Sequence, residues 1–284
     1  MEWIGEANEN QFKLKETVSF YDYYEQFKES PRNECRPTCI YLLDMLNYYE
    51  TENEDLFDRP HLDSPPVFGQ QLVEKNIKKN LKNFSEEGFN NKFLLLTGPN
   101  GSSKSSIVKK IMTGAEDYSK TTEGRLYTFS WVFPIDSYIK GTLSLTSSSS
   151  QYNLKSYADL EDKDINAIIN SDLKDHPLLL IPLDHRRRLI DDFFSDDMNF
   201  LDTVKKSYLY NGDLSKRNRM IYDALLKSYK GDHNEVLKHI RVERFFISKR
   251  FSNSAVTIEP QMHQDAKLQQ ITMDRRLELS LIHI

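Results

Sequence analysis

The stretch that decides the expected fold is Phe93-Leu94-Leu95-Leu96-Thr97-Gly98-Pro99-Asn100-Gly101-Ser102-Ser103-Lys104-Ser105. Its four leading apolar residues suit a short, fully buried strand. A turn rich in glycine and serine follows. After the turn, apolar residues recur at helical spacing from Ile107 to Ala115, which predicts a helix. We therefore expect a strand, a tight turn and a helix in this order.

The turn has the residue types that a phosphate-binding loop needs. Glycines at 98 and 101 let phosphate approach the backbone, and consecutive N–H groups can point toward it. Lys104 and Ser105 supply the ammonium for the β- and γ-phosphates and the hydroxyl for Mg²⁺. The helix that follows adds the positive end of its dipole. An accidental turn between a strand and a helix is the alternative interpretation.

One residue departs from the strict phosphate-loop pattern, which has glycine directly before the lysine. This chain has Ser103 at that place. Because the helix begins there, we expect a right-handed backbone, which tolerates a side chain.

Further elements extend outward from this stretch. Apolar residues at helical spacing predict helices within residues 18–49 and over 69–85. Residues 126–133 are aromatic and β-branched enough for a second strand. The order strand, helix, strand is typical of a parallel sheet, so we expect an α/β fold.

The rest of the chain divides into four expected segments. Residues 141–157 read as a low-complexity, mobile loop, and residues 159–170 as a short helix. Residues 186–240 form an expected helical insertion, and residues 244–258 alternate like the two arms of a hairpin.

Several stretches resemble the PrkA family of bacterial proteins, which are serine protein kinases built on an AAA-type ATPase domain. The resemblance covers about Val18 to Leu277. The stretches that carry it are Ser19–Tyr24, Asp44-Met45, Gly98–Ser105, Glu123–Tyr127, Trp131–Pro134, His176–Pro182, Tyr222–Leu226, Val242–Phe246 and Glu259–Met262.

The resemblance implies a P-loop NTPase (AAA-type) fold with a parallel sheet. A helical N-terminal segment over 1–58 would precede an incomplete nucleotide-binding domain over 59–278. Residues 279–284, Leu-Ser-Leu-Ile-His-Ile, look like a translated sequencing adapter and are expected to be a non-native tail. The chain is then expected to be an N-terminal fragment of a longer protein.

The resemblance and the loop chemistry together imply ATP and Mg²⁺ as cofactors. Val67-Phe68-Gly69-Gln70 lies just upstream and resembles the adenine-contacting stretch of AAA-type ATPases; a helix-entry turn is the alternative. Lys104 is the expected catalytic residue and Ser105 the expected Mg²⁺ ligand. The expected ATP-binding residues are Phe68, Gly69, Gly98, Pro99, Asn100, Gly101, Ser102, Ser103, Lys104, Ser105 and Ser106.

An ATPase of this class also needs an apolar strand that ends in acidic residues, which hold the Mg²⁺ shell and position water. The resemblance places that motif beyond Met262, past the end of the chain. The nearest match here is Leu180–Asp184, but Pro182 argues against a central strand.

Three functions stay open at this point. In the first, the full protein would be a serine protein kinase, as the family label says; in the second, it would be an ATP-driven remodelling or proteolysis-coupled machine without protein kinase activity. In the third, the loop is degenerate and the chain is a nucleotide-binding scaffold without hydrolysis. The resemblance further implies assembly into rings; a protein substrate is unknown.

Composition excludes several classes. The 284 residues include 38 basic and 43 acidic side chains, a net charge of −5, which argues against a nucleic-acid binder. Mean hydropathy is −0.63 and no apolar run reaches about 18 residues, so no membrane span is expected. The chain has only two cysteines, and its first residues do not resemble a secretory signal. Both features favour a cytoplasmic location.

Two further features have ordinary structural interpretations. Cys35 and Cys39 have no His pair beside them in the sequence, so we expect structural cysteines rather than a zinc site. The basic run His185–Arg188 is expected to be a solvated helix start. An arginine that reaches a neighbouring subunit's phosphate is the alternative.

Overall fold

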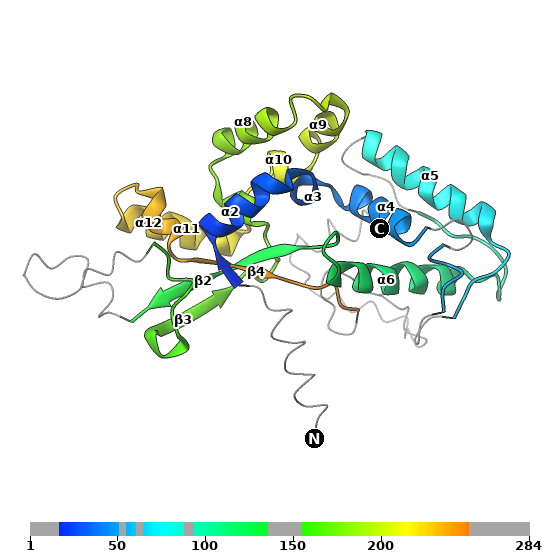
Figure 1. Ribbon diagram of the computed structural model, residues 1–284, viewed down its shortest axis with the longest axis horizontal. Helices are drawn as coiled ribbons and strands as arrows, with labels where there is room; N and C mark the ends of the chain where they lie inside the picture. Colours follow the sequence, from blue (N-terminus) through cyan, green and yellow to red (C-terminus); the bar gives the residue numbers. More distant parts are fainter. Residues whose placement is uncertain (1–16, 51–54, 61–64, 88–93, 136–154, 250–284) are drawn as a thin grey trace, which may run out of the picture. The chain divides into compact units, whose positions relative to one another are not determined.

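The computed structural model describes residues 17–50, 55–60, 65–87, 94–135 and 155–249 (Figure 1). The chain divides into two compact units, each made of two stretches. Unit 1 comprises Met1–Pro37 and Ser119–Phe246, and unit 2 comprises Thr38–Tyr118 and Ile247–Ile284. The expected boundary between residues 58 and 59 stays a prediction.

Unit 1 is built on a four-stranded sheet in the order β1-β4-β2-β3 (Figure 1). The strands are β1 (Thr17–Ser19), β2 (Tyr127–Pro134), β3 (Ile165–Asn170) and β4 (Ile240–Arg244). Every neighbouring pair is antiparallel. The central strand β2 is buried along almost its whole length. Tyr127, Phe129 and Trp131 alternate along it with Thr128 and Ser130, whose polar side chains are buried on the other face of the sheet.

The expected α/β fold with a parallel, AAA-type P-loop NTPase sheet is therefore wrong. Residues 126–133 do form a strand, but β2 uses one edge to pair with β3 and the other to pair with β4. The described residues before the glycine turn, 94–97, belong to no strand of this sheet. Leu94 and Leu95 are exposed rather than buried in a strand, because an apolar run becomes a strand only where neighbours complete its backbone hydrogen bonds.

Helices form the rest of the described part of unit 1. The first, α2 (Phe20–Glu29), starts where the Ser19 hydroxyl accepts a hydrogen bond from the backbone N–H of Asp22, and it buries Phe20, Tyr23 and Phe27. The others are α3 (Pro31–Cys35), α8 (Leu183–Phe193), α9 (Met198–Lys205), α10 (Tyr208–Asn211), α11 (Lys216–Ser228), α12 (His233–Leu237) and the 3-10 turns η1 (Asp162–Asp164) and η2 (Pro177–Leu180).

The helices expected within residues 186–240 are confirmed, and their role as an insertion stays a prediction. The helix expected over 159–170 is wrong. That segment holds η1 and the strand β3, whose isoleucines suit a sheet that β2 completes. Leu180–Asp184 is no strand, since η2 ends and α8 begins within it. The expected loop over 141–157 and the hairpin over 244–258 lie largely outside the described residues, although Ser156 and Tyr157 are buried.

Unit 2 contains α4 (Thr38–Tyr49), α5 (Gln71–Glu87) and most of α6 (Lys104–Lys120). All three are helices that the apolar spacing predicts. The rings of Tyr41 and Tyr48 lie 5.2 and 5.3 Å from the ring of Tyr118 on α6. Gly114 lets the segment before α5 approach α6 closely, because a Cβ there would lie 2.8 Å from a methyl carbon of Leu56.

No helix among the described residues combines the length and the apolar character that a membrane crossing requires.

Candidate functional site

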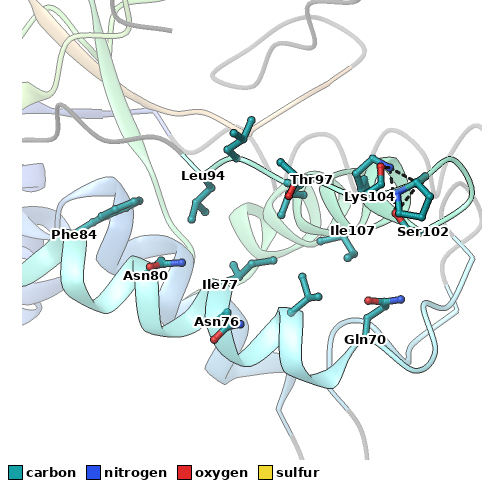
Figure 2. Close-up of a pocket in the computed structure, with 15 residues that line it drawn as sticks. Gln70, Asn76, Ile77, Asn80, Phe84, Leu94, Thr97, Ser102, Lys104 and Ile107 are labelled. Atoms are coloured by element: carbon teal, nitrogen blue, oxygen red, sulfur yellow. Dashed lines mark hydrogen bonds between the residues drawn. The ribbon is translucent and has the colours of Figure 1, made fainter.

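A pocket of about 760 Å³ lies within unit 2, between α5 and the segment that leads into α6 (Figure 2). Its volume is within the range of small-molecule sites. Its walls come from one face of α5, the stretch before the glycine turn, the turn itself and the first turns of α6. The lining residues are Gln70, Val73, Asn76, Ile77, Asn80, Phe84, Leu94, Leu95, Leu96, Thr97, Gly98, Pro99, Ser102, Lys104 and Ile107.

The turn owes its shape to three residues with positive φ. Gly98 has a φ of 154°, Gly101 of 83° and Ser103 of 61°. The right-handed backbone expected at Ser103 is therefore wrong: the residue lies in the left-handed region, which favours glycine. The structure thus gives a backbone reason why a glycine before the lysine would suit this turn.

A steric constraint also favours glycine at position 98. A Cβ on Gly98 would lie 2.9 Å from the Ser102 hydroxyl oxygen, so a larger residue would push that side chain out of the turn.

Lys104 folds back into the turn (Figure 2). Its ammonium donates hydrogen bonds to the carbonyl oxygens of Gly98, at 2.9 Å, and Pro99, at 2.6 Å, and to the Ser102 hydroxyl at 3.1 Å. The Ser102 hydroxyl in turn donates to the Pro99 carbonyl at 2.8 Å. All three acceptors are uncharged, and the pocket lining contains no carboxylate. The turn thus holds a positive charge at the edge of the pocket.

The turn leads directly into α6. The backbone N–H of Ile107 donates to the carbonyl of Ser103 at 2.9 Å, which is the first hydrogen bond of the helix. The N–H groups of Lys104, Ser105 and Ser106 come before that bond, so the helix leaves them without an intrahelical acceptor. The positive end of the α6 dipole therefore lies beside the ammonium of Lys104.

The expected site residues divide into two groups. Gly98, Pro99, Ser102 and Lys104 line the pocket. The other expected residues belong to the same turn, to the first turn of α6 or to the stretch before α5, and they are not part of the lining; these are Asn100, Gly101, Ser103, Ser105, Ser106, Phe68 and Gly69.

The α5 wall was missed by reasoning from the sequence. Gln70, Asn76 and Asn80 alternate along it with the apolar Val73, Ile77 and Phe84. The signal was present as amides at helical spacing next to the apolar stripe, but such amides are common on solvated helix faces.

Buried charged side chains on α5 and α6 contact the segment over 55–60. The pKa of Glu74 is raised to about 7 by burial and by the neighbouring carboxylate of Asp55. The buried ammonium of Lys110 donates to the carbonyl of Arg59, and burial lowers the pKa of Lys110. These contacts join both helices to that segment.

In unit 1, the expectation of a solvated basic run is wrong at Arg186. This side chain is 1% exposed, and its guanidinium donates to the carbonyls of Leu179, Ile181 and Gly212. It holds α8 against η2 and the link between α10 and α11. A guanidinium enclosed by its own chain cannot reach a neighbour's phosphate.

The interpretation of Cys35 and Cys39 as structural cysteines stays a prediction. Burial raises the pKa of the Cys35 thiol, and both cysteines are unbridged. Within the described ranges, no group of three or more His, Cys, Asp or Glu side chains is placed to hold a metal ion.

Comparison of the chain with protein-family models, with curated proteins and with solved structures found no match. Only the geometry of the pocket and its turn therefore indicates a function.

Proposed function

We propose that unit 2 binds a nucleoside triphosphate, ATP, together with Mg²⁺. The observation that supports this most is the ammonium of Lys104, which the turn holds among three uncharged acceptors at the edge of a pocket without carboxylates. A cation in that setting favours an anionic ligand, and the start of a long helix beside it does the same.

The turn fits a phosphate group. On binding, phosphate oxygens would take the place of the carbonyls of Gly98 and Pro99 as acceptors for Lys104, and charge-assisted hydrogen bonds are the stronger ones. The N–H groups at the start of α6 would donate to the same phosphate. The hydroxyl of Ser105 is the side chain proposed to hold Mg²⁺, which commonly keeps several water ligands and binds the phosphates directly.

One observation favours ATP binding without ATP hydrolysis. The lining residues include no Asp or Glu, so no carboxylate of the lining can accept a proton from an attacking water. We therefore propose that the described residues serve nucleotide binding, as in a non-hydrolysing scaffold. Protein kinase activity, ATP-driven remodelling and ring assembly would each need groups outside this pocket.

Titration calorimetry with ATP and Mg²⁺ tests the proposal. Wild-type protein should bind, and Lys104→Ala should weaken binding at least about tenfold, because a charge-assisted hydrogen bond is worth about 1.5–3 kcal/mol. Lys79→Ala is the matched control: it removes an exposed lysine of α5 that does not line the pocket, and its affinity should equal that of the wild type. Equal affinities for Lys104→Ala and wild type would refute the proposal.

Phosphate release and transfer of labelled γ-phosphate to protein should both stay at background in the same preparation. If either activity is measured and Lys104→Ala abolishes it, the result would favour a protein kinase or a remodelling ATPase over a non-hydrolysing scaffold.

A further inference from the structure

We infer that the α5 wall holds the base of the bound nucleotide and that Asn80 reads the hydrogen-bonding edge of that base. The inference rests on the proposed function and concerns the part of the same pocket that lies away from Lys104. It assigns a role to a residue outside the glycine turn.

The pocket changes in character along its length. In Figure 2, Lys104 and Ser102 lie at one end, near Gln70, whereas Phe84 and Asn80 lie toward the other. Asn80 is nine residues beyond Gln71, the first residue of α5, which is about 14 Å along a helix axis. One end is therefore cationic and the other is uncharged, so the complementary ligand is elongated and anionic at one end only.

The uncharged end suits a flat heteroaromatic ring. Ile77, Asn80 and Phe84 follow one another at spacings of three and four, so they share one face of α5. Leu94 lies across from that face (Figure 2). Aliphatic side chains and a phenyl ring offer surfaces on which a base can stack.

The amide of Asn80 gives this end its selectivity. An asparagine side chain carries both a donor and an acceptor, so it can form a paired contact with a base edge such as N6 and N7 of adenine. Asn80 is exposed, and no other described residue forms a hydrogen bond with its side chain. A ligand can therefore use both of its groups.

The test compares ATP with tripolyphosphate, which has the phosphates but no base, and with CTP, whose base is smaller. Wild-type protein should bind ATP at least tenfold more tightly than tripolyphosphate. Asn80→Leu keeps the approximate size of the side chain and removes the amide. This variant should weaken the binding of ATP about tenfold and leave the affinity for tripolyphosphate unchanged. It should also reduce the preference for ATP over CTP.

Asn83→Leu is the matched control, because Asn83 is on α5 but does not line the pocket; its affinities should equal those of the wild type. If ATP and tripolyphosphate bind wild-type protein equally, or if Asn80→Leu weakens both alike, the inference is overturned while the proposed function stands. If neither ligand binds wild-type protein, the proposed function itself fails, and the inference fails with it.

Discussion

At the scale of single residues, residue type and spacing single out the glycine turn. Gly98 and Lys104, which the sequence predicts to bind phosphate, both line the pocket, and their role in binding stays a prediction. What could not be inferred was the backbone at Ser103, because φ depends on how the turn meets the helix. The amides of α5 were missed for a related reason. A side chain that lines a pocket differs from a solvated one only in what lies opposite it, and the sequence does not show which segment lies opposite α5.

The left-handed backbone of Ser103 gives a stability prediction. A non-glycine residue with a φ of 61° carries about 1 kcal/mol or more of strain. Ser103→Gly should therefore raise the free energy of unfolding by up to about 1 kcal/mol, as measured by urea denaturation. Ser106→Gly, inside the first turn of α6, should lower it by about 0.5–1 kcal/mol. A lower free energy of unfolding for both variants would show that Ser103 is not strained.

At the scale of elements, helices were predicted well and strands poorly. The helices of unit 2 and the insertion over 186–240 follow from apolar spacing, which is local information. Strands depend on partners far away in the sequence. Residues 165–170 form β3 only because β2 pairs with them, and residues 94–96, with stronger apolar character, have no such pairing.

The buried guanidinium of Arg186 gives a prediction at this scale, since it joins α8 to η2 and to the α10–α11 link. Arg186→Met would leave the carbonyls of Leu179, Ile181 and Gly212 without their donor. We expect the variant to lose about 3 kcal/mol of unfolding free energy in a urea titration. Arg188→Met, at an exposed position of the same helix, should change it by less than about 0.5 kcal/mol.

At the scale of the whole molecule, the two units should respond to pH in opposite directions. His239 in unit 1 is buried between the carbonyl of Val132 and the hydroxyl of Tyr229, and burial lowers its pKa below 6.5. The unfolded chain therefore takes up this proton first as the pH falls, so unit 1 loses stability below about pH 6.5.

The titration of Glu74 changes the stability of unit 2 with pH in the opposite direction. Its pKa is raised from 4.5 to about 7, so the folded form takes up the proton first, and unit 2 gains stability as the pH falls from 7 toward 4.5.

Hydrogen exchange measured at pH 7.5 and 5.5, corrected for the intrinsic rate, checks this contrast. Amides of β4 should become less protected at the lower pH and amides of α5 more protected. The change should be up to about 1 kcal/mol per pH unit in each case. Glu74→Gln should abolish the gain in α5 and leave the loss in β4 unchanged. Parallel changes in both units would contradict the assignment.

The order of strands in unit 1 also constrains how the protein can be made. Val18 in β1 pairs with Val242 in β4, and β4 lies between β1 and β2 in the sheet. A ribosome that adds about 5–20 residues per second needs on the order of ten seconds or more to pass from one strand to the other. During that interval β1 has emerged without its neighbour, while the local helices of unit 2 can already form. The sheet therefore cannot be completed until β4 has been made, and until then a newly made chain should depend on chaperones through the unpaired β1.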